Sequence, residues 1–77
     1  MNEEISLMDK LGDFVKFKRL KKGYTQTELA NRMELKGING NYISRLERKD
    51  LQGMNILTLE TMLSTLDSGL TFIERDI

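Results

Sequence analysis

The chain contains no cysteine and no histidine among its 77 residues. Without cysteine no disulfide can form, so nothing in the sequence points to an oxidising compartment. Without either residue, thiolate and imidazole ligands for a metal are excluded, and so are nucleophiles and bases of those two types. We therefore expect neither a metal site nor a cofactor.

Other features that would mark an enzyme or a membrane protein are missing too. No motif joins a nucleophile, a base and an orienting third group, and the sequence has no glycine-rich phosphate loop. The first residues carry Glu3 and Glu4 instead of the basic region and apolar run of a signal peptide. No apolar run approaches the ~20 residues that span a bilayer. The sequence predicts a cytoplasmic protein that is not an enzyme and has no membrane partner.

The chain is short, with a mass of 8.9 kDa and 39% hydrophobic residues. This length suits one domain with short tails. A domain of this size buries only about 60% of the surface that its unfolded chain exposes, so its stability alone is marginal. We therefore expect the working unit to be a homodimer.

The charges are balanced overall but segregated along the chain. Twelve basic and twelve acidic residues give a net charge of zero. Residues 1–9 carry a net charge of −3, residues 10–49 one of +7, and residues 50–77 one of −4. A basic segment between acidic ends gives the surface field a direction, and such fields steer polyanions. An ordinary solvated helix surface is the alternative explanation of the same charges.

Apolar residues recur at helical spacing in four stretches. The predicted helices cover residues 7–22, 26–34, 41–49 and 59–66. Thr25 and Glu28 form a capping-box pair ahead of the second helix, and Thr58 is the expected cap of the fourth. Residues 36–40 are expected to form a turn because they contain two glycines and an asparagine. In the connection that follows the third helix, Met54 and either Ile56 or Leu57 are expected to pack inward.

The end of the chain predicts a different element. Residues 70–74 are β-branched, aromatic and placed after a glycine, which favours a short strand that includes Leu70, Phe72 and Ile73. A single strand leaves its backbone groups unpaired, so it needs its own copy across a dimer axis or another protein's sheet edge. A frayed terminus is the alternative. We divide the chain into an acidic tail (1–6), a domain (7–67) and a strand or tail (68–77).

Two motifs carry a family resemblance. The pattern G-x-T-Q-x-E-L-A occupies residues 23–30, and Y-I-S-R-L-E occupies residues 42–47. Together they resemble the lambda-repressor-like (Xre/Cro) helix-turn-helix family, over roughly residues 11–66. The resemblance implies an all-α domain of four to five helices with a helix-turn-helix at about residues 25–49. It also implies sequence-specific binding of double-stranded DNA by a homodimer, which would act as a repressor on an inverted repeat.

The second helix of that motif would read base edges. The resemblance puts Asn41 and Arg45 at base-reading positions, and asparagine suits the adenine edge as arginine suits the guanine edge. Gly40 falls at a third such position but has no side chain. Tyr42 and Ser44 complete the expected set and suit a thymine methyl group or a phosphate.

A second set of residues is expected to hold phosphates. Gln26 lies in the first turn of its helix, where a side-chain amide and free backbone N–H groups suit an anion. The full set consists of Thr25, Gln26, Lys36, Asn39, Arg48 and Lys49. The basic members of this set could instead be plain solvated charges. Arg19 and Glu47 match the family's structural ion pair between the first helix and the recognition helix.

The sequence departs from the family pattern in two places. The segment between Ala30 and Tyr42 is longer than in usual members, so either the helix ahead of it or the turn must be longer. The tail gives a strand where many relatives have a fifth helix, and this ending is similar to the HipB-type antitoxins. Those proteins repress their own operon, bind a kinase toxin and pair C-terminal strands across a homodimer.

The antitoxin resemblance leaves a second function open. A protein-binding module would neutralise a toxin through its outer helical face or its acidic tail, with DNA binding secondary. Phe14 and Phe17 together exceed what one helix face can bury, which favours a partner on the first helix. Packing of both rings in the core or a dimer contact is the alternative.

Overall fold

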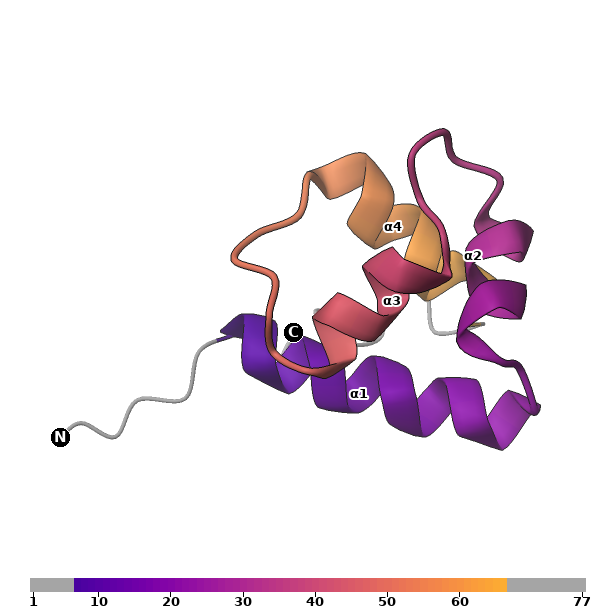
Figure 1. Ribbon diagram of the computed structural model, residues 1–77, viewed down its shortest axis with the longest axis horizontal. Helices are drawn as coiled ribbons and strands as arrows, with labels where there is room; N and C mark the ends of the chain where they lie inside the picture. Colours follow the sequence, from indigo (N-terminus) through magenta and orange to yellow (C-terminus); the bar gives the residue numbers. More distant parts are fainter. Residues whose placement is uncertain (1–6, 67–77) are drawn as a thin grey trace, which may run out of the picture.

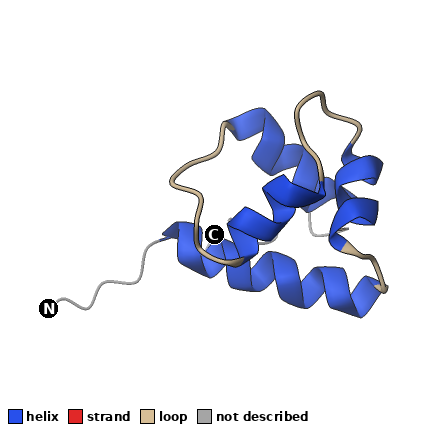
Figure 2. Cartoon of the chain, in the orientation of Figure 1, coloured by secondary structure: helices blue, strands red, loops and turns tan. Residues whose placement is uncertain are grey.

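Four helices account for the regular structure of residues 7–66, the part of the chain that this computed structural model describes. They are α1 (Leu7–Lys22), α2 (Gln26–Met33), α3 (Gly40–Glu47) and α4 (Ile56–Thr65), shown in Figure 1. Within these residues there is no strand (Figure 2). The acidic tail and the predicted strand with Leu70, Phe72 and Ile73 lie outside the described residues.

The helix ends follow local capping chemistry. α1 spans the predicted residues. At the start of α2, Thr25 Oγ1 accepts a hydrogen bond from the Glu28 backbone N–H at 3.0 Å, and Glu28 Oε1 accepts one from the Thr25 N–H at 2.8 Å. The predicted capping box is confirmed. It satisfies two N–H groups that a helix start otherwise leaves without partners.

The start of α4 differs from the prediction. Asn55 is the N-cap, because its Oδ1 accepts from the Thr58 backbone N–H at 2.9 Å. Thr58 therefore lies inside the first turn and is buried, so its prediction as the cap was wrong. The earlier start also turns Ile56 and Leu57 to the surface, and of the expected inward residues only Met54 packs against the core.

The long connection between α2 and α3 is an enlarged loop over residues 34–39 and does not extend α2. Glu34 ends α2 in the left-handed conformation, with φ of 56°. Leu35 and Ile38 are half-buried and pack against the core, which fixes the loop at two points. Asn39 then caps α3, which begins at Gly40 and ends at Glu47, two residues before the predicted end.

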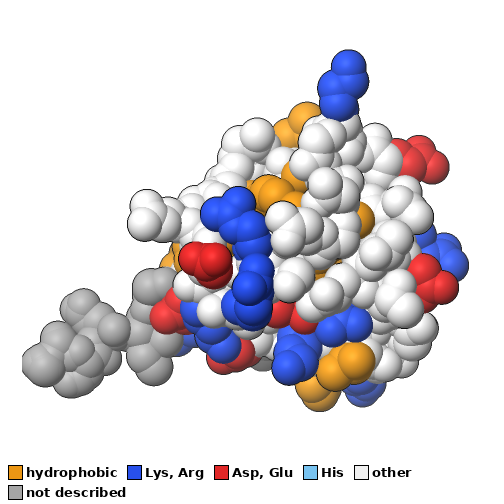
Figure 3. Space-filling model, in the orientation of Figure 1, with side chains coloured by type: hydrophobic (Ala, Val, Ile, Leu, Met, Phe, Trp, Pro, Cys, Tyr) orange, Lys and Arg blue, Asp and Glu red, His pale blue; other side chains and the backbone are white. Residues whose placement is uncertain are grey.

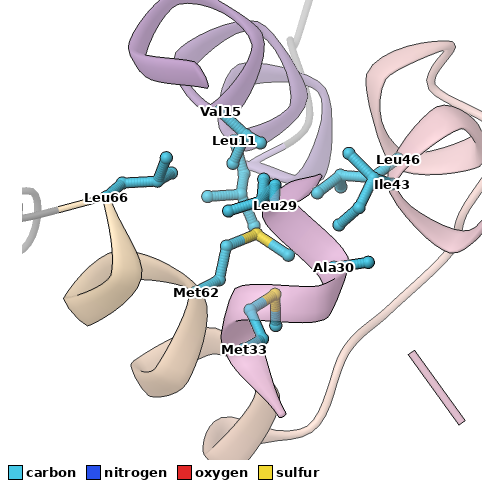
Figure 4. Packing of buried hydrophobic residues seen from close by; sticks show 9 residues of the cluster. All are labelled: Leu11, Val15, Leu29, Ala30, Met33, Ile43, Leu46, Met62 and Leu66. Carbon is cyan, nitrogen blue, oxygen red and sulfur yellow. The ribbon is translucent and has the colours of Figure 1, made fainter. Parts of the chain in front are cut away.

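The core lies between all four helices (Figure 4). Each helix contributes apolar side chains that are almost fully buried. The cluster consists of Leu11, Val15, Leu29, Ala30, Met33, Ile43, Leu46, Met62 and Leu66. Burial of one such side chain stabilises the fold by about 1.5–3 kcal/mol relative to leaving it exposed.

α3 sits at the centre of the arrangement, packed against both α2 and α1 (Figure 1). The contact with α1 is close, because Gly12 faces the backbone at the end of α3. A Cβ at Gly12 would lie 2.5 Å from the Leu46 carbonyl oxygen, which real Cβ atoms essentially never approach so nearly. The crossing of α1 and α3 therefore requires a residue without a side chain at this point.

Gly12→Ala should lower the free energy of unfolding by about 1–3 kcal/mol, because the added methyl group forces the two helices apart. The higher helix propensity of alanine alone would raise the free energy of unfolding, by up to about 1 kcal/mol. Urea titration followed by circular dichroism measures the difference. Gly53→Ala is the matched control, since a Cβ there meets nothing within 4 Å. A Gly12→Ala protein as stable as the control would contradict the close crossing.

Candidate nucleic-acid interface

α3 has one buried side and one exposed side. Ile43 and Leu46 are buried in the core. Asn41 and Arg45 are exposed, and so is Arg48 directly after the helix. Residues three and four apart share a face of a helix, so these three polar side chains form one outward stripe. Tyr42 and Ser44 flank this stripe and are half-buried.

The surroundings of Arg45 and Tyr42, both predicted to read bases, are set within the chain. Arg45 Nη2 donates to the Asp50 carbonyl oxygen at 3.2 Å, at the exposed turn that follows α3. Burial raises the pKa of the Tyr42 phenol, and the charge of Arg45 acts in the opposite direction. Tyr42 therefore stays a neutral hydroxyl at ordinary pH.

Gly40, the third predicted base-reading position, is required by packing, since a Cβ there would lie 2.6 Å from Thr27 Oγ1.

The asparagine and threonine predicted to hold phosphates both act as helix caps. Thr25 caps α2, and Asn39 Oδ1 accepts from the Tyr42 backbone N–H at 3.0 Å. Their side-chain oxygens are thus used inside the fold. Among residues 7–66, the hydroxyl proton of Thr25 and the amide N–H groups of Asn39 have no hydrogen-bond partner.

The basic residues of the predicted phosphate set differ in their surroundings. Lys36 is exposed on the loop between α2 and α3. Arg48 Nε donates to the Ser44 carbonyl oxygen at 3.3 Å. Lys49 forms an ion pair with Asp13 of α1, so part of its charge is compensated inside the chain. Of the three side chains, only that of Lys36 forms no hydrogen bond or ion pair with another of the described residues.

The centre of the site is a carboxylate shared by three helices. Arg19 of α1 donates from Nε to Glu47 Oε2 at 2.7 Å and from Nη2 to Oε1 at 2.9 Å. Gln26, the first residue of α2, donates from Nε2 to the same Oε1 at 3.1 Å. The Arg19 and Glu47 side chains are only 9% and 4% exposed, and hydrogen bonding to Glu47 raises the pKa of Arg19.

Figure 3 shows several Lys and Arg side chains on one face of the molecule. They gather over the end of α3 and over α1, with a few carboxylates among them. Residues 10–49, which supply α2, α3 and most of α1, carry eleven basic and four acidic residues. The arrangement offers a polyanion hydrogen-bond donors and positive charge together.

Sequence reasoning missed several contacts of this surface. The Gln26–Glu47 hydrogen bond joins residues 21 apart, and the Lys49–Asp13 ion pair joins residues 36 apart. Neither has a signal in local sequence, because local patterns reach only about four residues along a helix. The family resemblance suggested the Arg19–Glu47 pair alone.

Comparison of the chain with protein-family models, with curated proteins and with solved structures finds no match. Among residues 7–66 no helix has the length and apolar character needed to cross a bilayer. The same residues contain no group of three or more acidic side chains that could hold a metal ion. The geometry of α2 and α3 and the two sequence motifs are thus the features that bear on function.

Arg19→Lys should lower the free energy of unfolding by about 1–3 kcal/mol, because one ammonium group cannot replace the bidentate contact with Glu47 and leaves buried acceptors unsatisfied. Thermal and urea unfolding measure the loss. Asp13→Asn, which removes the exposed ion pair with Lys49, is the control and should leave both midpoints nearly unchanged. Equal midpoints for the two variants would contradict a structural role for Arg19.

Proposed function

We propose that this protein is a sequence-specific DNA-binding regulator of transcription, a repressor that acts as a homodimer on an inverted repeat. One observation carries the proposal: α3 is anchored by Ile43 and Leu46 while Asn41, Arg45 and Arg48 form an exposed stripe. A short helix so anchored, with amide and guanidinium groups outward, suits the major groove, which is about 12 Å wide.

In this proposal α2 and α3 form a helix-turn-helix of the lambda-repressor-like type. Asn41 reads an adenine through N6 and N7, and Arg45 reads a guanine through O6 and N7. Arg45 leaves its contact with the Asp50 carbonyl oxygen to do so, at little cost because that contact is exposed. Tyr42 and Ser44 line the same groove, where both hydroxyl groups can donate to a base or a phosphate.

The remaining predicted residues hold the sugar–phosphate backbone on either side of the groove. Such contacts set the register of a protein on DNA and carry no sequence information. The proposed set consists of Thr25, Gln26, Lys36, Asn39, Arg48 and Lys49. A strand that includes Leu70, Phe72 and Ile73 would pair across the dimer axis and place two α3 helices about 34 Å apart, one turn of DNA.

Arg45→Ala and Gln26→Ala should weaken DNA binding in different ways. Selection from randomised duplexes first defines the preferred sequence, and fluorescence anisotropy then measures affinity for each single-base variant. Arg45→Ala should lower the affinity for the preferred duplex by about 5- to 150-fold, the equivalent of about 1–3 kcal/mol. It should lower the affinity little for duplexes in which the base pair that Arg45 reads is already changed. Loss of Gln26 should weaken all duplexes alike.

A salt titration is the second arm of this experiment. The logarithm of the affinity should fall with the logarithm of the salt concentration, with a slope of about 0.9 for each phosphate that a lysine or arginine neutralises. Gln26→Ala removes a neutral donor and should keep that slope, whereas Lys36→Ala should reduce it. A flat response of Arg45→Ala across the duplex variants would count against base reading by α3.

A second candidate function is neutralisation of a toxin, with DNA binding in the same protein. It is favoured by the outer side of α1, where Phe17 and Leu20 are 59% and 58% exposed. Lys21 Nζ lies 5.3 Å from the Phe17 ring centroid, so the apolar surface has a basic border. Of the two alternatives for Phe17, packing in the core is wrong within the described residues, since most of its surface is exposed, and a dimer contact stays a prediction.

Phe17→Ser should release a toxin partner while leaving DNA affinity unchanged. The test is co-purification of the full chain from its native host, with the product of the gene immediately downstream as the expected partner. Leu57→Ser is the control, because Leu57 is similarly exposed but lies on α4. Absence of a stoichiometric partner would exclude the toxin function, and equal loss in both variants would exclude α1 as its docking side.

A further inference from the structure

The carboxylate of Glu47 is held on both sides. Its two oxygens receive Arg19 Nε and Nη2, and the third nitrogen of the same guanidinium, Nη1, donates to the Tyr24 carbonyl oxygen at 2.8 Å. A guanidinium is planar and its donors are fixed relative to one another. The carboxylate therefore cannot turn without loss of at least one short hydrogen bond.

The fixed carboxylate in turn orients the Gln26 amide. The terminal torsion of a glutamine is broad and nearly two-fold, so a free side chain presents its oxygen or its nitrogen with similar ease. A carboxylate only accepts hydrogen bonds, and it selects the nitrogen end. Gln26 Nε2 gives one N–H to Glu47 Oε1, and its second N–H has no partner among residues 7–66 and can serve an acceptor outside the chain.

A phosphate, like a carboxylate, only accepts. A glutamine already fixed with its N–H groups on the correct side avoids the cost of ordering a flexible side chain at the moment of binding. We infer that Glu47 is the positioning residue for the Gln26–phosphate contact and acts through the Gln26 amide without touching DNA. This inference rests on the DNA-binding function proposed above.

Because Glu47 is negatively charged, the direction in which DNA affinity changes when the charge is removed tests the inference. Removal of a negative charge beside a polyanion ordinarily strengthens binding, because repulsion is relieved. Arg19 lies against Glu47 and compensates its charge, so little repulsion is present to relieve. A positioning role predicts that loss of the carboxylate weakens binding, opposite to the purely electrostatic effect.

The experiment is a double-mutant cycle on the selected DNA duplex, read by fluorescence anisotropy. The variants are Glu47→Gln, Gln26→Met and the double variant; Gln26→Met removes the amide and leaves the Arg19–Glu47 pair in place. Glu60→Gln is the charge-matched control, because Glu60 is exposed on α4. Urea unfolding of each variant separates loss of stability from loss of affinity. Glu47→Asp, which keeps the charge and draws the carboxylate back from Gln26, replaces Glu47→Gln if that variant does not fold.

Each single variant should bind the duplex about tenfold more weakly, and the double variant should lose no more than either single one. Glu60→Gln should bind as the parent does or slightly more tightly. The positioning role is overturned if Glu47→Gln binds like Glu60→Gln, or if the two losses multiply to about a hundredfold as independent effects do. A parent protein that enriches no sequence from the random duplexes overturns the proposed function itself, which distinguishes the two failures.

Discussion

The carboxylate of Glu47 joins three of the four helices, and most of the α2–α3 surface depends on it. It lies at the end of α3, receives two donors from Arg19 of α1 and a third from Gln26 of α2. A charge pair this deeply buried is not a large net source of stability, because its desolvation offsets much of the attraction. Its role is directional, because the observed placement of the three helices brings all three donors onto one carboxylate. In the described part of the chain no buried side-chain nitrogen or oxygen lacks a partner.

The close approach of α1 to α3 follows from the same constraint. Arg19 can reach Glu47 only if the two helices cross closely, and Gly12 permits that crossing by leaving room for the Leu46 carbonyl oxygen. With α3 held from below by α1 and from the side by α2, its two buried side chains fix which residues face outward. The exposed stripe of Asn41, Arg45 and Arg48 is thus a consequence of packing on the opposite side.

Basic and acidic residues are concentrated in different segments of the chain. The positive charge lies in residues 10–49, which form α1, α2, α3 and the loop, whereas residues 50–77 are acidic. A net charge of zero for the whole chain therefore conceals a strong difference in charge between its segments. Phe17 and Leu20 are exposed on α1, whereas Arg19 between them is buried and contacts Glu47 of α3, so one stretch of α1 has both an inner and an outer side.

The sequence by itself determined the helices and most of their ends. The span of α1 and the Thr25–Glu28 capping box were predicted, because periodicity and capping act within about four residues. Thr58 was wrongly predicted as a cap because Asn55, three residues earlier, caps the helix instead and accepts from the Thr58 N–H. Both residue types can cap a helix, and local pattern does not rank the two positions. The motifs suggested the Arg19–Glu47 pair and the residues that would meet DNA.

Only the tertiary structure decided how distant residues meet. It made the long connection a loop anchored by Leu35 and Ile38, which pack against the core. It also brought Gln26 to Glu47 and Lys49 to Asp13. These contacts join residues far apart in the chain, and they exist only once buried side chains have fixed the crossing of the helices. No local rule contains that information, because it resides in the packing of the whole core.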